Sequence, residues 1–395
     1  MMLPVTGVAP LTAAELVRAR NYLYGDLLAG TLAQVGTLAL LALAYWSGVA
    51  ARLEGALARR WRRRWVVTAG VTAALIAGVE ALLLPFSIYL GYVREREFGF
   101  ERMPAGAWLG QWAVSVLVTV AAAVLVVAVA WGWLRRPRGP RWWVKLWVVV
   151  AAGVVFGVAI DPILIEPLFN HFTPVRDAAV RADLSALAAR AGIPHASIEE
   201  MDASRQSGHT NAYVVGILGS QRIVVYDTLL AAQPRAEIEF VVGHEIGHYV
   251  LHHLWKGVGF TLLFLLGVFA VAGALVPRWS RGEPIAAASA LPLVLLVVLG
   301  VVYLAAPLTN GFARWEEHQA DVYGLRLSGQ PCAAVASFER EEHTDLIYPD
   351  PPEWVVAWFF NHPSQQERID YAARYCISGA RGAAAPGAAP HQFVR

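Results

Sequence analysis

Long apolar stretches alternate with short polar ones along most of this chain. Six of the stretches are long and apolar enough to cross the ~30 Å hydrocarbon core of a bilayer as helices. They cover residues 27–46, 66–92, 107–134, 143–165, 254–276 and 286–308. The first stretch has no basic lead-in and no small-residue cleavage site, so it does not resemble a signal peptide. The pattern predicts an all-α membrane protein with about six transmembrane helices.

One polar stretch, residues 166–253, differs from the rest because it mixes helical and strand-like patterns. Within it, 211–217 and 222–228 are rich in β-branched and aromatic side chains. This predicts two strands, joined by a hairpin turn at Leu218–Gln221. A helix is expected to begin near Pro234 and to run on into the fifth span. We therefore expect a small soluble α+β insert.

These patterns divide the chain into five parts. The two membrane parts are 1–165, with four transmembrane helices, and 254–309, with two. Between them lies the insert, 166–253, and after them a helical region, 310–377. The tail, 378–395, is rich in Ala, Gly and Pro, and is expected to be disordered.

Composition supports the membrane assignment. The 395 residues are 57% hydrophobic and only 16% charged, with a mean hydropathy of +0.47, whereas ordinary globular chains carry about 25% charge. The net charge of +2 gives no sign of nucleic-acid binding. The arginines cluster between apolar runs, which is a signal of membrane topology. Gly-rich phosphate loops and Ser/His/Asp signatures are absent from the sequence.

The strongest chemical motif is His-Glu-Ile-Gly-His at residues 244–248. On a helix, His244 and His248 lie four residues apart on one face, so both imidazoles can bind one metal ion. Glu245 lies beside them, where its carboxylate can take a proton from a water at the metal. The motif fixes only three positions, so a chance match on a surface helix is the alternative.

A second pair of polar residues offers the missing ligand. Glu317 and Asp321 again lie four residues apart. A catalytic zinc has three protein ligands and one open position. Glu317 would be the third ligand, and Asp321 would accept the spare ring N–H of a ligand histidine. The alternative is a solvated acidic turn, since Glu316 and His318 are polar too.

Taken in order, several short strings of the chain resemble the integral-membrane CAAX prenyl protease family of zinc endopeptidases. The strings are Leu84-Pro85-Phe86-Ser87-Ile88-Tyr89, Pro167-Leu168-Phe169-Asn170, His209-Thr210-Asn211-Ala212-Tyr213-Val214-Val215-Gly216, Arg222-Ile223-Val224-Val225-Tyr226-Asp227-Thr228-Leu229-Leu230, the two metal motifs, Asn361-His362-Pro363 and Glu367-Arg368-Ile369. The resemblance runs from about residue 15 to residue 375. Eukaryotic members of that family carry one further span near the N-terminus, giving seven.

This resemblance implies a chamber between the membrane helices, with the zinc site facing inward. It also implies that Asn211, Ala212 and Tyr213 form an edge strand that pairs with the substrate backbone; an ordinary buried strand is the alternative. His362 and Arg368 match family positions near the active site, where a donor would stabilise the oxyanion. Alternatively, His362 caps a helix before Pro363, and Arg368 binds an acidic residue behind the metal ligands.

Three other histidines are weaker candidates for the active site. His252 and His253 continue the polar face of the zinc motif, but the third metal ligand of metzincins would have to lie at position 254, which is Leu254. Both histidines are therefore expected to be interfacial side chains. His209 precedes the expected edge strand and either points into the site or belongs to a turn.

The function predicted from these features is peptide hydrolysis assisted by one zinc ion. Glu245 is the expected general base. The expected partners are the lipid bilayer and a peptide or membrane-protein substrate. The composition suggests a bacterial source, so we expect this substrate to be unprenylated. We expect a monomer. The alternatives are a heat-shock-type membrane quality-control peptidase and a catalytically silent scaffold stabilised by zinc.

Loop charges predict the orientation in a bacterial plasma membrane. With six spans, loops 47–65, 135–142 and 277–285 share one face and carry the excess of arginine. Cytoplasmic loops carry such an excess, which places the catalytic face outside the cytoplasm. Cys332 and Cys376 would lie on that outer face, where a disulfide between them is permitted. Two buried free thiols are the alternative.

Overall fold

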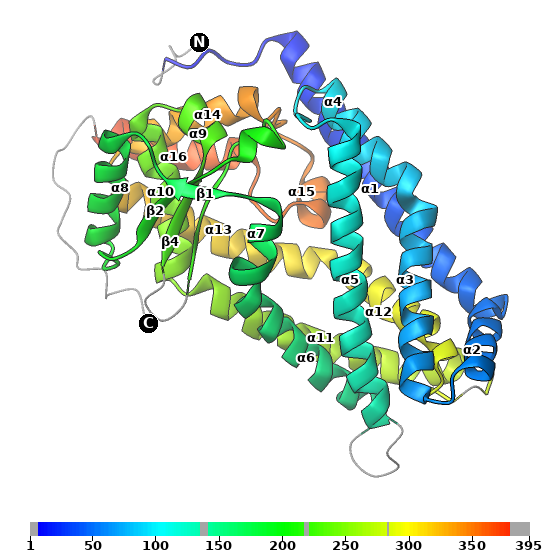
Figure 1. Cartoon of the computed structure of the whole chain (residues 1–395). Coiled ribbons are helices and arrows are strands. Elements are labelled where there is room, and N and C mark those ends of the chain that lie inside the picture. Colours follow the sequence, from blue (N-terminus) through cyan, green and yellow to red (C-terminus); the bar gives the residue numbers. More distant parts are fainter. Residues whose placement is uncertain (1–6, 135–140, 217–220, 283, 380–395) are drawn as a thin grey trace.

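The long apolar helices form one end of the molecule, and a small sheet with shorter helices forms the other (Figure 1). This computed structural model describes residues 7–134, 141–216, 221–282 and 284–379. Within them, five helical segments are long and apolar enough to cross a membrane, and a bent pair of helices is a sixth candidate. The five contain α1 (Ala13–Trp46), α3 (Arg64–Ile88), α5 (Ala105–Leu134), α6 (Trp142–Ile160) and α11 (His253–Trp279). The prediction of about six spans is confirmed.

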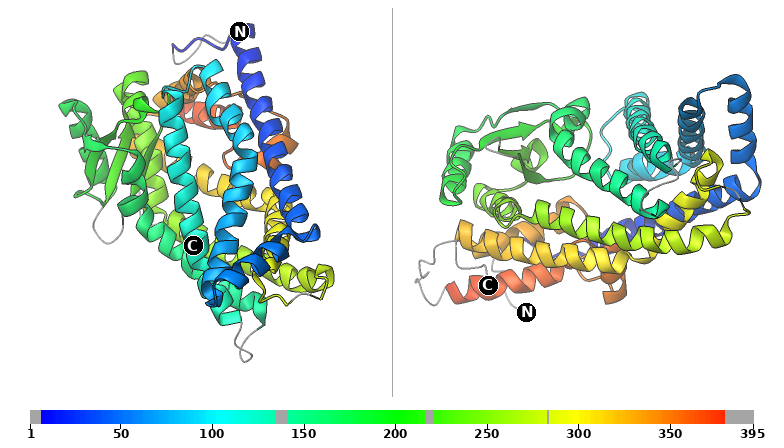
Figure 2. Two further views of the ribbon diagram at one scale, coloured as in Figure 1. Left: turned by 45° about the vertical axis from the view of Figure 1, so that its right-hand side comes forward. Right: turned by 90° about the horizontal axis from the view of Figure 1, so that it is seen from below.

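The six candidate spans form a closed ring. Each packs against two others, in the order α1, α3, α5, α6, α11 and α12 (Leu291–Leu304), and α12 returns to α1; Figure 2 shows the ring from two further sides. After α12 the chain bends by 52° into α13 (Ala306–Ser328). One end of the ring is filled by a core that includes Trp131, Leu146 and Phe269. The ring agrees with the fold that the family resemblance implies, in which membrane helices surround a chamber.

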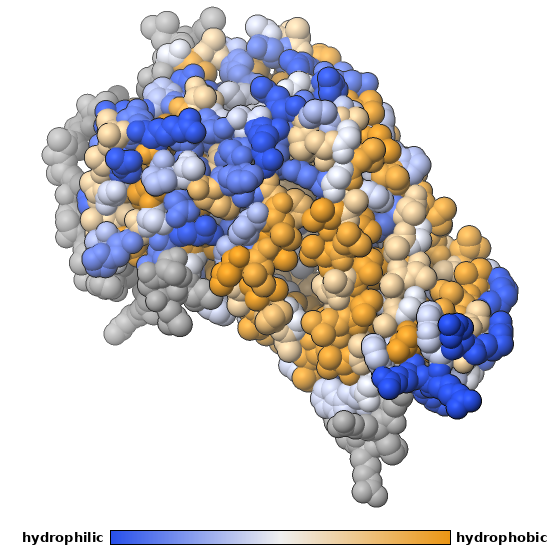
Figure 3. Space-filling model, in the orientation of Figure 1, coloured by the Kyte–Doolittle hydropathy of each residue, from blue (hydrophilic) through white to orange (hydrophobic). Residues whose placement is uncertain are grey.

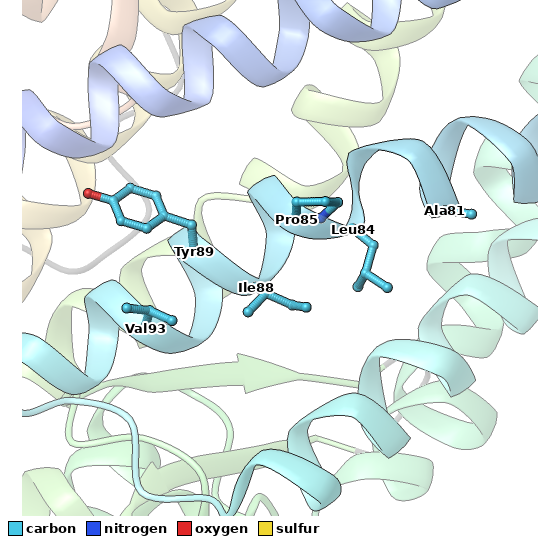
Figure 4. A pocket seen from close by; sticks show the side chains of 6 residues that line it. All are labelled: Ala81, Leu84, Pro85, Ile88, Tyr89 and Val93. Atoms are coloured by element: carbon cyan, nitrogen blue, oxygen red, sulfur yellow. The ribbon is translucent and has the colours of Figure 1, made fainter.

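Helix α3 lines an apolar pocket of about 470 Å³. Pro85 lies inside this helix and removes one backbone donor. The helix continues as a π-helical turn, Tyr89–Arg94, and then as α4 (Glu95–Glu97). The side chains that line the pocket come from successive turns (Figure 4): Ala81, Leu84, Pro85, Ile88, Tyr89 and Val93.

The soluble part is built on a four-stranded sheet in the order β1-β2-β4-β3. Its strands are β1 (Phe172–Pro174), β2 (Ser197–Met201), β3 (Ala212–Val215) and β4 (Arg222–Tyr226). The two predicted strands are present as β3 and β4, which pair antiparallel, although both are shorter than expected. Residues 218–220 of the expected turn lie outside the described residues. The sequence did not reveal β1 and β2.

Buried side chains hold one helical layer on this sheet. Leu184 and Leu187 of α8 (Ala178–Arg190) share a core with Ile223 and Val225 of β4. The same core includes residues of α10 (Arg235–Val250), which follows α9 (Asp227–Ala232). The position of α10 is therefore fixed by the sheet.

The prediction that the zinc helix runs on into the fifth span is wrong. Helix α10 ends at Val250, and α11 begins at His253. Between them His252 adopts a left-handed backbone conformation, with φ of 58°. That conformation cannot continue a right-handed helix, so the soluble helix and the span are separate elements.

Three helices complete the C-terminal region: α14 (Pro331–Thr344), α15 (Glu353–Phe359) and α16 (Gln365–Gly379). A disulfide between Cys332 and Cys376 joins α14 to α16. This decides between the two alternatives for these cysteines. Ser378 and Gly379 belong to α16, and the remainder of the predicted disordered tail lies outside the described residues.

Candidate active site

Helix α10 carries the first metal motif and is buried on several sides. Val242 and Ile246 pack into the core of the sheet, and Phe240 packs with the C-terminal helices. Helix α13 crosses close to the motif because a glycine stands at the contact. A Cβ atom on Gly324 would lie only 2.8 Å from the backbone nitrogen of His244. No pattern in the sequence indicated this requirement.

The structure brings the predicted metal ligands together. One ligand atom each from His244, His248 and Glu317 lies within 4.8 Å of the others. The two Nε2 atoms are 3.1 Å apart, and they lie 3.2 and 3.4 Å from the Glu317 carboxylate oxygens. Oε2 of Glu317 is buried and makes no hydrogen bond. Two imidazoles and a carboxylate are a donor set that suits zinc.

Each histidine is also held at its other ring nitrogen. Nδ1 of His244 lies 2.8 Å from Oδ1 of Asp321, and Nδ1 of His248 lies 3.0 Å from Nδ1 of His253. His253 is buried, so the expectation that it is an interfacial side chain is wrong. The break at His252 starts α11 beside the motif, and this brings His253 to His248.

Arg368 forms a two-pronged contact with Asp321. Its Nε and Nη2 atoms donate to the two carboxylate oxygens at 3.0 and 2.7 Å. Burial works against the charge of Arg368, but the neighbouring Asp321 carboxylate raises its pKa overall. Arg368 thus contacts Asp321, and Asp321 contacts His244, one of the predicted metal ligands.

Glu245 lies beside the ligand group. Its Oε1 is 3.9 Å from Nε2 of His244. Burial raises the pKa of Glu245 above its usual value. A raised pKa suits a general base, since efficient proton transfer needs a pKa near the working pH.

His362 approaches the same group from the loop before α16. Its Nε2 is 3.2 Å from Oε2 of Glu317, and its Nδ1 is 2.8 Å from Oδ1 of Asn361. Burial lowers the pKa of His362 to about 4; the positive charge of Arg368 adds to the shift, and the Glu317 carboxylate opposes it. His362 does not cap α16, because Ser364 and Glu367 exchange the capping hydrogen bonds.

The strand β3 lies at one edge of the sheet, against the zinc-motif helix. It pairs with β4 on one side only. Ala212 is buried in the core that also holds Val242 and Ile246. Asn211 precedes the strand and accepts a hydrogen bond from the backbone of Tyr226 through its carbonyl. Tyr213 packs edge-on against the ring of Tyr226.

His209 joins the start of this strand to the membrane helices. Its ring nitrogens lie 3.1 Å from Asp345 and 3.1 Å from Glu95, and Phe100 stacks on its ring. Thr210 donates to Asp345 from both its backbone and its hydroxyl. Burial alone would lower the pKa of His209, but the hydrogen bonds to the two carboxylates raise it to about 9. None of these contacts reaches a metal ligand.

Two family models match most of the chain. Residues 174–375, which hold the sheet and the metal group, match peptidase family M48. The chain belongs to peptidase family M48. Residues 3–171 match a model described as the CAAX prenyl protease N-terminal region with five membrane helices. In the described part of that region, this M48 peptidase has four candidate spans and the short helix α2 (Val49–Arg60).

Relatives agree with this assignment. A metalloprotease of Bacillus subtilis, YhfN, is 30% identical over 83% of this chain and 78% of its own length. A CAAX prenyl protease 1 homolog of Dictyostelium discoideum is 30% identical over 75% of this chain and 70% of its own. The crystal structure of S. mikatae Ste24p has the same fold, with a TM-score of 0.78 and 22% identity over 91% of this chain and 89% of that one. This M48 peptidase is a membrane-embedded, multi-pass metallopeptidase.

Proposed function

We propose that this peptidase holds one zinc ion through His244, His248 and Glu317. The observation that supports this most is the convergence of three ligand atoms within 4.8 Å, with the second nitrogen of each histidine already occupied. Zinc, when bound, supplies Lewis-acid chemistry: it polarises a peptide carbonyl and makes water more acidic.

The surrounding residues carry out proton transfer, stabilise the oxyanion and position the ligands. The Glu245 carboxylate takes a proton from the attacking water and passes it to the leaving nitrogen of the peptide. His362 directs its Nε2 towards this group, where an N–H at that nitrogen donates a hydrogen bond to the developing oxyanion. Asp321 orients His244, and Arg368 orients Asp321. Arg368 is therefore a positioning residue in this proposal, since both of its contacts go to that carboxylate.

The substrate is an extended peptide that pairs with the free edge of β3, at Asn211, Ala212 and Tyr213. Strand addition uses backbone groups, so it does not require a prenyl group. Several relatives are named CAAX prenyl proteases, but we propose that this enzyme cleaves unprenylated peptides or membrane-protein segments. It acts as a monomer in a bacterial plasma membrane, with its catalytic face outside the cytoplasm.

Replacing Glu245 tests the chemistry. Glu245→Gln should keep its zinc, because Glu245 is not a ligand, and should lose peptide cleavage by roughly 10²-fold or more. Glu317→Ala should lose both zinc and cleavage. Zinc content is measured by elemental analysis and cleavage with a quenched peptide library. If Glu245→Gln cleaves at the wild-type rate, the proposed chemistry is wrong; if the wild type cleaves nothing, the protein is a scaffold.

A matched pair of peptides tests the substrate. The value of kcat/KM is compared for one peptide with and without a farnesyl group. Similar values support recognition through the backbone. An obligatory preference for the farnesylated peptide would refute that part of the proposal and leave the zinc chemistry intact.

A further inference from the structure

The turn between α2 and α3 carries a dense group of arginines. It lies at the end of the molecule opposite the sheet (Figure 1). Five exposed arginines stand there: Arg59, Arg60, Arg62, Arg63 and Arg64. In the described part of the chain, none of the five forms an ion pair with a carboxylate. The nearby Glu54 accepts a hydrogen bond from the backbone of Ser289 at 2.8 Å.

Two of these arginines line a cavity of about 450 Å³. One wall is formed by α2 and the α2–α3 turn, with Trp61, Arg62 and Arg64, and the other is the loop before α12, which includes Ala287. Glu54 also lines the cavity, and its carboxylate accepts the hydrogen bond from Ser289. The indole of Trp131 donates to the carbonyl of Ala287 at 3.0 Å. Together with the bond from Ser289 to Glu54, this contact fixes the second wall, so the cavity is part of the folded structure.

The cavity lies where a membrane surface is expected. Arg64 is the first residue of a candidate span, and the apolar surface over the long helices gives way to a hydrophilic patch at α2 (Figure 3). Trp61 and Trp65 are exposed on either side of Arg62 and Arg64. Tryptophan is enriched at the level of the lipid head groups.

The chemistry of the cavity favours a phosphate. Guanidinium groups bind phosphate oxygens in pairs, and unpaired arginines gain most from such a contact. Their charges stand at the start of α3, where positive charge is unfavourable beside the helix dipole. A bound anion would give the guanidinium groups an ionic partner and would offset the unfavourable interaction of their charges with the dipole of α3. The apolar lining residues Val67 and Pro284 suit the glycerol and the first carbons of an acyl chain.

We propose that this cavity binds the head group of an anionic phospholipid from the adjacent leaflet. Arg62 and Arg64 contact the phosphate, and Trp61 covers it from the water side. The site is independent of the metal group and of the proposed peptide chemistry.

Lipid binding to the full chain in detergent tests the proposal. Phosphatidylglycerol and phosphatidylcholine with identical acyl chains are compared by native mass spectrometry. The wild type should bind phosphatidylglycerol at least about tenfold more tightly, and Arg62→Gln/Arg64→Gln should lose this preference. The matched control, Arg59→Gln/Arg60→Gln, removes the same charge from residues that do not line the cavity, and should retain it.

Three outcomes would overturn the proposal. Equal losses in both double variants would mean that diffuse charge, rather than the cavity, attracts the lipid. No preference in the wild type would mean that no such site exists. Competition by soluble glycerol phosphate as strong as by the lipid would indicate a site for free phosphate compounds. Zinc content, measured in parallel, verifies that each variant is folded.

Discussion

At the scale of single residues, the most informative contact is the one between His248 and His253. A ligand histidine that is held at its second nitrogen keeps its ring orientation and tautomer, and loss of such a partner typically weakens metal binding 10–100-fold. Of the two proposed ligand histidines, His244 contacts Asp321 at this nitrogen, and His248 contacts the buried His253.

We therefore expect His253→Asn to weaken zinc binding by about 10- to 100-fold. The neighbouring variant His252→Asn is the control, because His252 is exposed and Asn tolerates its left-handed backbone. Competition with a chelator measures both affinities. Equal zinc affinity in His253→Asn and the wild type would show that the contact does not support the metal site.

Arg368 and Asp321 form a buried ion pair whose partners depend on each other. Asp321 is only 3% exposed, so Arg368→Gln leaves a charge in the interior without its partner. We expect the free energy of unfolding to fall by about 3–5 kcal/mol. Arg374→Gln, at an exposed position of the same helix, should change it by less than about 0.5 kcal/mol. Denaturant titration in detergent compares the two, and an equal change in both would contradict this view of Arg368.

The proposed site residues that could be paired from the sequence are those with local spacing. His244 with His248, and Glu317 with Asp321, lie one helical turn apart, and a helix fixes such pairs before any tertiary structure is known. His253 was misjudged because its position depends on the break at His252, and histidine carries no strong signal for such a break. The sequence could not identify the partner of Arg368, because Arg368 and Asp321 lie far apart in the sequence and are brought together only by the tertiary fold.

At the scale of elements, His209 links strand β3 to the first helices. Its ring contacts Glu95 and Asp345, and Tyr22 of α1 donates to the same Glu95. The position of the edge strand thus depends on a polar group that the sequence assigned only to a turn or to the site itself.

The pKa of His209 makes this link dependent on pH. Its folded-state pKa of about 9 lies above the ordinary value of 6.5. The stabilisation is therefore complete below pH 6.5 and is lost as the pH rises through 9. Between these values the melting temperature of the wild type should fall more than that of His209→Gln. His195→Gln, which changes an exposed histidine, should keep the wild-type slope. Parallel slopes for all three proteins would rule out this role of His209.

The membrane spans could be predicted from the sequence, but some strands could not. The spans were predictable because about 20 apolar residues in a row have few other uses. Strand β2 was not, because Ser197–Met201 includes two glutamates and only two buried side chains, Ile198 and Met201. Its position comes from parallel pairing with β4, which is a tertiary contact and leaves no local pattern.

At the scale of the whole molecule, the proposed orientation has a direct test. The Cys332–Cys376 disulfide lies on the catalytic side, and Cys332 is exposed. We expect a membrane-impermeant thiol reagent to label intact cells only after reduction. Cys332→Ser/Cys376→Ser, which has no thiol, should stay unlabelled. Labelling that requires permeabilised membranes would place the catalytic face in the cytoplasm.

The closed ring also sets an order of events during synthesis. Helix α1 packs against α12, which emerges from the ribosome roughly 240 residues later. At about 5–20 residues per second, α1 waits on the order of 10–50 s for this neighbour. For that time the face of α1 that packs against α12 meets lipid or the insertion machinery instead of its final neighbour. The ring therefore closes at α1 and α12 only late in synthesis, and a chain truncated before residue 291 would keep an open ring that is exposed to degradation.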